Sequence, residues 1–369
     1  MRIPLIKPCI TGEDHQCMVH AVNDEAYSDG KNTRVFEQKI SSFLSIKGAI
    51  ATNSCTSSII LALSALGVKR HDEVVIPTYT CISILHAVSQ FGAIPKLADI
   101  EINTNTMNYN VCANSIEKIL SSKTKVIIVP HMFGVSAQLE QILAFNIPVI
   151  EDITLSFGAK YKNNPLGTWG SACVSSFHLS KLLPCGEGGM FGSTKLKILD
   201  RARYLNSWEQ EQVGMRTGKI QLRQYETRYN YHLSGILASL GISQLKKMNK
   251  FTEQRRKIAN IYTNELKHLE VLKLPNIEEN TENIYQRYLV NIDEHFNIIE
   301  ILNQFHEYGI EVGRGVYPPL HHVLGLNCRS FSNTEKAVKS VLSLPVYPSL
   351  NENDLNYIID SCKKIFSRH

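Results

Sequence analysis

The sequence predicts an α/β protein, in which a mainly parallel seven-stranded sheet is sandwiched by helices and followed by a smaller C-terminal α+β domain. Between residues 49 and 193, short apolar segments alternate with amphipathic helical segments, as in a parallel sheet covered on both faces. At 369 residues the chain is also longer than one hydrophobic core requires. We therefore expect an N-terminal arm and large domain at residues 1–250 and a small domain at residues 251–369.

The N-terminal part begins with an arm that carries one short helix within about the first 25 residues. A polar turn at residues 27–32 precedes a helix that places Phe36, Ile40 and Leu44 on one face. The expected strands follow at residues 49–52, 73–77, 96–99, 125–130, 148–152, 172–177 and 189–193. The helices expected between them lie at residues 57–66, 82–91, 115–121 and 138–145.

After Lys195 we expect a helix that ends at about residue 205. An arginine-rich irregular loop is expected at residues 208–228. A long helical segment then covers residues 233–269, with a turn near residues 248–249. In the small domain we expect strands at residues 288–292 and 312–317 and amphipathic helices at residues 297–308 and 353–366.

Composition excludes several classes of protein. The content of 43% hydrophobic and 20% charged residues is that of an ordinary globular protein. The net charge of +5 is scattered rather than clustered with aromatics, which argues against nucleic acid as a partner. The nine cysteines show no CxxC and no zinc-like spacing, so no metal is expected. No apolar run reaches the roughly 20 residues of a membrane span, and charges near the start argue against a secretory signal. A cytoplasmic protein with free thiols is the expectation.

Two strand ends carry the side chains that suggest chemistry. Asp152 ends an apolar strand, and Lys181 shortly follows the strand at 172–177, beside a glycine-rich turn at 185–189. Ligands of such sheets bind beyond the carboxyl ends of the strands. A lysine and an aspartate side by side suit pyridoxal 5′-phosphate, because the lysine forms a Schiff base and the carboxylate keeps the pyridine nitrogen protonated. Taken alone, a strand-end aspartate is as often a cap or turn residue, and a lone lysine is in most cases a surface residue.

A phosphate site is the second candidate feature. Residues 53–58, with the sequence NSCTSS, precede an apolar helix. Hydroxyl groups and free N–H groups at a helix start bind phosphate, although ordinary N-capping would use the same residues. Ser176 could bind phosphate or satisfy nearby backbone. His178 is interpreted as a wall of the pocket or a structural residue rather than a base.

These motifs are part of a longer ordered series. Between about residues 28 and 366 the chain contains NSCTSSIILALSALGV, DEVVIPTYT, LADI, VPHMFG, IPVIEDITLSFGA, SSFHLSKLLPCGEGGMFGS, RYNYHLSGILASLGISQLKKM, GVYPPLH and VLSLPVYPSLNENDLNYII. In content and order the series resembles the DegT-type sugar aminotransferase family, which are pyridoxal-phosphate enzymes with the aspartate-aminotransferase fold. Ordered coincidence of this kind is far more specific than any single motif.

The resemblance assigns the cofactor residues position by position. Lys181 matches the Schiff-base lysine, and Asp152 matches the aspartate that pairs with the pyridine nitrogen. Cys55 and Thr56 match the phosphate-binding turn, and Ser176 matches the phosphate-binding serine.

Other matches concern the substrate and a second subunit. Asn230 matches an asparagine that reaches the neighbouring subunit's cofactor phosphate, which implies a homodimer with shared active sites. Tyr317 and His321 match the small-domain loop near the substrate, and His178 is a further candidate for the substrate pocket.

Three positions depart from the family pattern. Leu155 stands where a glutamine usually contacts the cofactor, and His232 replaces an arginine. Cys81 stands where an aromatic ring usually stacks on the cofactor, with Tyr79 nearby. Some members carry histidine in place of the lysine and act as dehydratases, so the presence of Lys181 argues against that reaction.

The resemblance implies that the enzyme transfers an amino group from glutamate to a ketosugar, expected to be a nucleotide-linked keto-deoxysugar, for amino-sugar biosynthesis. Three alternatives stay open: a pyridoxal-phosphate sugar dehydratase, a cyclitol aminotransferase, and a non-catalytic paralogue that binds the cofactor. The sequence does not specify the sugar, the nucleotide or the aminated carbon, because pocket loops rather than the fold set that choice.

Overall fold

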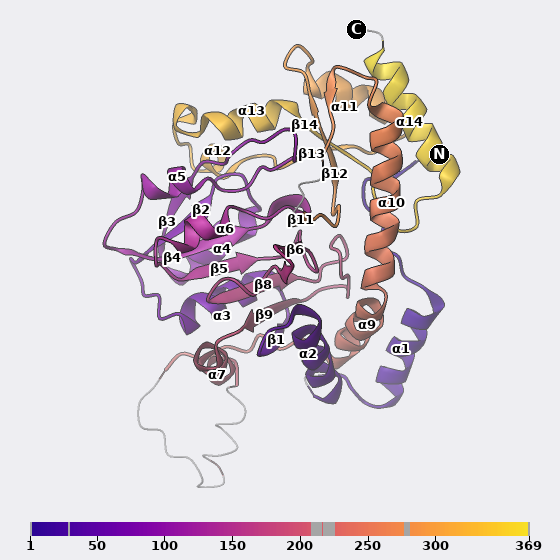
Figure 1. The fold of residues 1–369 in the computed structure, drawn as a ribbon. Coiled ribbons are helices and arrows are strands. Elements are labelled where there is room, and N and C mark those ends of the chain that lie inside the picture. The colour runs from indigo at the N-terminus through magenta and orange to yellow at the C-terminus, as the bar shows by residue number, and fades with distance from the viewer. Residues whose placement is uncertain (1, 29, 208–215, 217–225, 277–280, 368–369) are drawn as a thin grey trace.

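The computed structural model describes residues 2–28, 30–207, 216, 226–276 and 281–367, and gives the backbone alone for residues 281–282. Its centre is a seven-stranded sheet with strand order β1-β9-β8-β5-β4-β2-β3 (Figure 1). The strands are β1 (Gly48–Thr52), β2 (Glu73–Pro77), β3 (Ile94–Ala98), β4 (Thr124–Pro130), β5 (Val149–Asp152), β8 (Ala172–Ser176) and β9 (Gly189–Ser193). Only β9 runs against its neighbours in this sheet, so the predicted fold class is confirmed.

Helices cover both faces of this sheet because its strands carry apolar side chains on both sides. In β4, Val126 and Ile128 pack on one face, and Ile127 and Val129 pack on the other. The first face is covered by α3 (Cys55–Ala65), α4 (Ile82–Phe91) and α7 (Leu196–Leu205). The second face is covered by α2 (Lys31–Leu44), α5 (Ala113–Glu117), α6 (Leu139–Leu143) and α9 (Gly235–Lys246).

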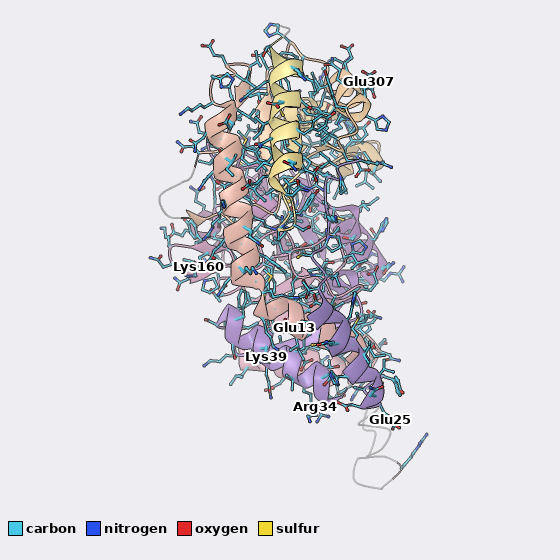
Figure 2. The ribbon with its side chains drawn as sticks, turned by 90° about the vertical axis from the view of Figure 1, so that its right-hand side faces the viewer. Glu13, Glu25, Arg34, Lys39, Lys160 and Glu307 are labelled. Atoms are coloured by element: carbon cyan, nitrogen blue, oxygen red, sulfur yellow. The ribbon has the colours of Figure 1, made fainter. Side chains whose placement is uncertain are left out.

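The long helical segment of the sequence is two helices. It breaks at Lys247, between α9 and α10 (Met248–Leu266), close to the expected turn. Lys247 Nζ lies 2.6 Å and 2.5 Å from the two carboxylate oxygens of Asp14 in α1 (Gly12–Asn23), which fixes α1 against α9. Figure 2 shows α10 running beside α14 (Glu352–Phe366), with charged side chains such as Glu13 and Lys39 on the outside of α1 and α2.

The small domain is built on an antiparallel sheet with order β10-β12-β14-β13. Its strands are β10 (Leu272–Lys273), β12 (Tyr288–Ile292), β13 (Gly313–Arg314) and β14 (Val341–Leu344). It is covered by α10, α14 and α11 (Ile298–Glu307). The strand expected at 312–317 is shorter, because after Arg314 the chain passes so close to the large domain that a Cβ on Gly315 would lie 1.9 Å from the Tyr79 hydroxyl.

Short elements complete the structure and join the two parts. They are η1 (Met132–Gly134), α12 (Leu320–Val323), η2 (Cys328–Phe331), α13 (Ser332–Ser340) and a small sheet of β11 (Thr281–Glu282), β6 (Lys160–Tyr161) and β7 (Asn164–Pro165). Ile3 pairs with Ile310 and lies in the small-domain core, so the N-terminal arm contacts both domains. Asp29 of the expected turn, and residues 208–215 and 217–225 of the expected loop, lie outside the described residues. Within the described ranges, none of the helices combines the length and apolar character that crossing a bilayer would need.

Candidate active site

A cavity of about 550 Å³ opens at the carboxyl ends of β2, β4, β5 and β8, where residues 315–318 of the small domain close over it. The parallel strands bring the residues that follow them to this one edge of the sheet. Of the ten site residues predicted from sequence, eight line the cavity: Cys55, Thr56, Cys81, Asp152, Ser176, His178, Lys181 and Tyr317.

Asp152 lies at the inner end of this cavity, as the last residue of β5. Its carboxylate is buried, and Oδ1 accepts a hydrogen bond from the Thr154 N–H at 2.9 Å. Burial raises the pKa of Asp152, and hydrogen bonds from Thr154 and the charge of Lys181 oppose that rise. A carboxylate in this position gains stability from a cation placed beside it in the cavity.

Thr154 connects the residues around Asp152, although the sequence analysis did not assign it a role. Its Oγ1 accepts a hydrogen bond from the Ser176 N–H at 3.0 Å and lies 3.7 Å from the Cys55 Sγ. Thr154 therefore links the ends of β5 and β8 to the start of α3. The sequence feature that could have indicated this role is the hydroxyl residue two positions after the strand-end aspartate.

The start of α3 faces the same cavity. Ser54 caps the helix, since its Oγ accepts a hydrogen bond from the Ser57 N–H at 3.1 Å. The N–H groups of Cys55 and Thr56 belong to the first turn, where no carbonyl of the helix can accept their hydrogen bonds. Gly189 of β9 allows the start of α3 to approach the sheet this closely, because a Cβ on residue 189 would lie 2.5 Å from the Cys55 backbone nitrogen. Burial raises the pKa of the Cys55 thiol well above its ordinary value, so a neutral side chain stands beside these donors.

Lys181 enters the cavity from a tight turn after β8. Its N–H donates to the His178 carbonyl at 2.9 Å, and the chain then returns through Gly186 and Gly188, both at positive φ. The Phe177 N–H donates to the Gly188 carbonyl at 2.9 Å, which closes the loop against the strand. Glycine is suited to both positions because it has no Cβ to clash at positive φ.

A second buried carboxylate, that of Glu151, supports the site from behind. It accepts hydrogen bonds from the N–H groups of Gly167, Trp169 and Gly170 at 2.8, 2.8 and 2.6 Å and lies 3.1 Å from His131 Nε2. The Ala137 N–H donates to His131 Nδ1 at 3.1 Å, so the ring proton is on Nε2 and points to Glu151. The orientation of His131, which lines the cavity near Asp152, is thereby fixed.

Arg287 supplies a cation from the small domain. It lines the cavity, and its Nη1 donates to the Arg314 carbonyl at 3.3 Å. Its Nε is buried and has no hydrogen-bond partner among the described residues. Burial lowers the pKa of Arg287, and an anionic group in the cavity would offset that cost. The sequence analysis did not select Arg287, because an arginine at the start of a strand carries no distinctive motif.

Two predicted residues do not line the cavity. His321 is fully buried behind the cavity wall, with Nδ1 2.7 Å from Thr78 Oγ1 and Nε2 2.9 Å from Glu335 Oε1, so the expected direct contact with substrate is not met by this geometry. Asn230 is exposed and lies outside the cavity. Its expected role concerns a second subunit and stays a prediction.

The three departures from the family pattern have different surroundings. Leu155 lines the cavity, and Cys81 is exposed at its rim. Tyr79 is fully buried in the core between the domains rather than in the cavity, so it does not supply the missing stacking ring. His232 also lies outside the cavity lining.

The arrangement of donors fits pyridoxal 5′-phosphate. The helix start at Cys55 and Thr56 with the nearby Ser176 suits its phosphate, and Asp152 suits its pyridine nitrogen. Lys181 provides an amine in the same cavity for its aldehyde. The phosphate, the ring nitrogen and the aldehyde of this cofactor therefore each have a chemically matched partner at one sheet edge.

Comparison with known proteins agrees with this assignment. Residues 8–363 match the model of the DegT/DnrJ/EryC1/StrS aminotransferase family. The chain is 28% identical over 381 residues to GDP-perosamine synthase of Escherichia coli O157:H7, covering 99% of each chain. It is 27% identical over 380 residues to the spore coat polysaccharide biosynthesis protein SpsC of Bacillus subtilis, covering 98% of this chain and 97% of that protein. The aminotransferase TlmJ from Streptoalloteichus hindustanus has the same fold, with a TM-score of 0.89 at 24% identity and 99% coverage of each chain.

Proposed function

Since the chain belongs to the DegT/DnrJ/EryC1/StrS aminotransferase family and is a pyridoxal-phosphate-dependent sugar aminotransferase, we propose that its substrates are glutamate and a nucleotide-linked ketosugar. The observation that carries this proposal is the placement of Lys181, Asp152 and the start of α3 around one cavity. The relative named GDP-perosamine synthase supports a nucleotide-linked sugar, because its name joins a nucleotide to the sugar product. The pathway class is amino-sugar and polysaccharide biosynthesis.

We assign the cofactor-holding roles to this chain's own residues. When bound, pyridoxal phosphate supplies an electron sink for the negative charge that develops at the reacting carbon. The amides of Cys55 and Thr56 and the Ser176 side chain would hold its phosphate, and Cys81 would face the cofactor from the rim of the cavity. Asp152 holds a proton on the ring nitrogen, and Thr154 fixes the carboxylate by its N–H.

Lys181 has two tasks in this proposal. Its amine would hold the cofactor in the resting enzyme through the cofactor's aldehyde. As a free amine, Lys181 Nζ would take the proton from the carbon of the amino donor, and it would return a proton to the carbon of the ketosugar. His131, held by Glu151, positions the Asp152 side of the cavity and does not itself transfer a proton, because its Nε2–H already donates to Glu151.

We assign substrate binding to the side of the cavity that the small domain forms. Arg287 binds an anionic group of the substrate, most simply the carboxylate of glutamate, through its guanidinium. Tyr317 is more than half exposed, with the Arg314 guanidinium 3.9 Å from its ring centroid, and forms the outer rim with His178. His321 acts from behind this rim as a positioning residue.

We further propose a homodimer with shared active sites, in the cytoplasm. The exposed Asn230 would reach the partner's cofactor phosphate, and all nine cysteines are unpaired, as in a reducing compartment. A mixture of Lys181→Ala and Asn230→Ala proteins tests this, since a mixed dimer has one active site with neither substitution. Activity restored on mixing supports shared sites; a mixture no more active than either variant contradicts them.

The two half-reactions separate the proposed activity from its alternatives. With glutamate alone, the enzyme should release 2-oxoglutarate and accumulate pyridoxamine phosphate. The loaded enzyme should then aminate one of a panel of UDP-, dTDP- and GDP-linked ketosugars. Turnover with a free cyclitol ketone alone would contradict the proposal that the substrate is linked to a nucleotide. Release of water from the sugar without any use of glutamate would indicate a dehydratase. No turnover with any substrate would indicate a non-catalytic paralogue that binds the cofactor.

A further inference from the structure

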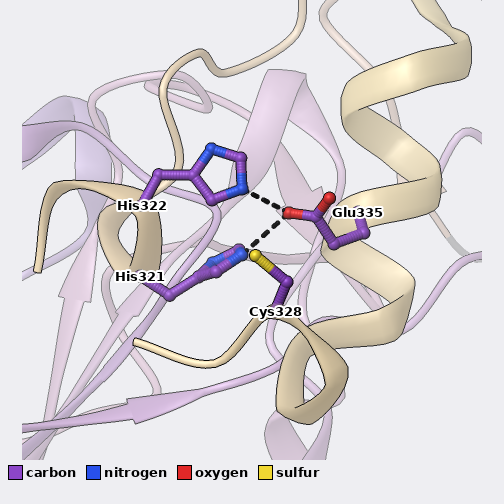
Figure 3. Close-up of side chains that lie close together, drawn as sticks. All are labelled: His321, His322, Cys328 and Glu335. Carbon is purple, nitrogen blue, oxygen red and sulfur yellow. Dashed lines mark hydrogen bonds and ion pairs between the residues drawn. The ribbon is translucent and has the colours of Figure 1, made fainter. Parts of the chain in front are cut away.

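Four side chains that the proposed mechanism does not use as catalysts converge outside the lining of the cavity. They are His321 and His322 from α12, Cys328 from η2 and Glu335 from α13 (Figure 3). Their ligand atoms all lie within 4.8 Å of one another. His321 is buried, Glu335 is half-buried, and His322 and Cys328 are exposed, so the cluster is accessible from one side.

The two histidines point to one place although they are neighbours in the chain. His321 Nε2 lies 2.9 Å from Glu335 Oε1, and His322 Nε2 contacts the same oxygen. Consecutive side chains on a helix point about 100° apart, so this convergence is not the default outcome. The His321 ring is also held in place by stacking on Phe331, with ring centroids 4.6 Å apart.

His321 has the outer contact that metal-binding histidines use. Its Nδ1 lies 2.7 Å from Thr78 Oγ1, at the end of β2, while its Nε2 faces the cluster. When the ring proton is on Nδ1 and directed to the Thr78 oxygen, the Nε2 lone pair is free to bind a cation.

We propose that His321 Nε2, His322 Nε2, Cys328 Sγ and a Glu335 carboxylate oxygen bind one zinc ion. Two imidazoles, a thiolate and a carboxylate form a set that a tetrahedral, borderline-soft divalent metal prefers. With Zn–N and Zn–O bonds of about 2.0 Å and one Zn–S bond of about 2.3 Å, tetrahedral ligand atoms lie about 3.3–3.5 Å apart. His321 Nε2 therefore needs to move about 0.4 Å away from Glu335 Oε1, and His322 Nε2 about 0.8 Å, while ligand atoms that now lie up to 4.8 Å apart move closer together.

The site is structural, because the protein supplies all four ligands. Its ligands lie within residues 321–335 and would join α12, η2 and α13, while Thr78 attaches the group to the large domain. The spacing H-H-x₅-C-x₆-E contains a single cysteine. Because the cysteines of this chain show no paired zinc spacing, the sequence predicted no metal.

Metal titration of the whole protein, stripped with a chelator and reloaded with pyridoxal phosphate, tests the proposal. We expect one equivalent of Zn²⁺ to bind and to raise the midpoint of thermal unfolding. We expect Co²⁺ in its place to give visible d–d bands and a thiolate-to-metal charge-transfer band that Cys328→Ser abolishes. His322→Asn should weaken Zn²⁺ binding by about ten-fold or more.

Matched variants control for unrelated thiols and imidazoles. Cys9→Ser and the exposed His295→Asn should leave both metals bound as in the wild type. The proposal is overturned if the wild type binds no more Zn²⁺ than the His322→Asn/Cys328→Ser double variant, or if Cys328→Ser keeps the charge-transfer band. Neither readout uses the aminotransferase reaction, so the result does not depend on the proposed substrates.

Discussion

The buried carboxylate of Glu151 gives the most quantitative prediction. Each of its oxygens is shared by two donors: Gly167 N–H and His131 Nε2–H on one, Trp169 N–H and Gly170 N–H on the other. In Glu151→Gln, one oxygen becomes an NH₂ group that faces two donors in either amide orientation. Two buried donors lose their acceptor, at about 1–3 kcal/mol each, so we expect a loss of about 2–6 kcal/mol in the free energy of unfolding.

Urea unfolding followed by circular dichroism measures this loss, with Glu140→Gln as the control. Glu140 forms an exposed ion pair with Lys162 at 2.6 Å, and such pairs contribute about 0–1 kcal/mol. His131 cannot compensate by moving its proton, because its Nδ1 already accepts the Ala137 N–H. If Glu151→Gln destabilises the protein no more than Glu140→Gln does, the account of this buried network is wrong.

Three further predictions follow from single contacts. Thr154→Val removes the acceptor of the Ser176 N–H and should weaken pyridoxal phosphate binding about ten-fold in a fluorescence titration; unchanged affinity would exclude the linking role. Burial raises the pKa of Asp14, but bonds from Lys247 and Thr11 outweigh this and lower it from 3.8 to about 2. Asp14 therefore stabilises the fold above pH 3.8, and that stability is lost as the pH falls towards 2. Midpoints of urea unfolding measured over this pH range should fall less in Asp14→Asn than in the wild type. Parallel pH profiles of the two proteins would contradict the assignment. Arg287→Gln should raise the KM for glutamate about ten- to a hundred-fold, whereas a change in kcat alone would argue against substrate binding.

The sheet and its order of elements could be predicted because a strand buried on both faces leaves a strong signal. The predicted strand bounds at Glu73–Pro77, Gly189–Ser193 and Tyr288–Ile292 are those observed, since apolar runs there end at polar or glycine residues. The residues at strand ends, Asp152 and Ser176, followed from the same pattern because parallel strands end at one edge.

The remainder of the site depends on contacts between distant segments. Arg287 enters the cavity from a strand more than 100 residues after Lys181, and no local pattern indicates that approach. His321 was expected at the substrate, but the close approach of Gly315 to Tyr79 carries the chain past the cavity and leaves the imidazole behind its wall. The Glu151 network was missed because a buried charge is recognisable only once its donors are in place.

The central claim is that Lys181 is the residue that holds pyridoxal phosphate in the cavity above Asp152. Borohydride reduction of the cofactor-loaded protein, followed by peptide mass spectrometry, tests it most directly, because reduction makes the bond between lysine and cofactor permanent. We predict a single pyridoxyl label, on the peptide that contains Lys181, and no label in Lys181→Ala. A label on another lysine, or a labelled Lys181→Ala protein, would contradict the account.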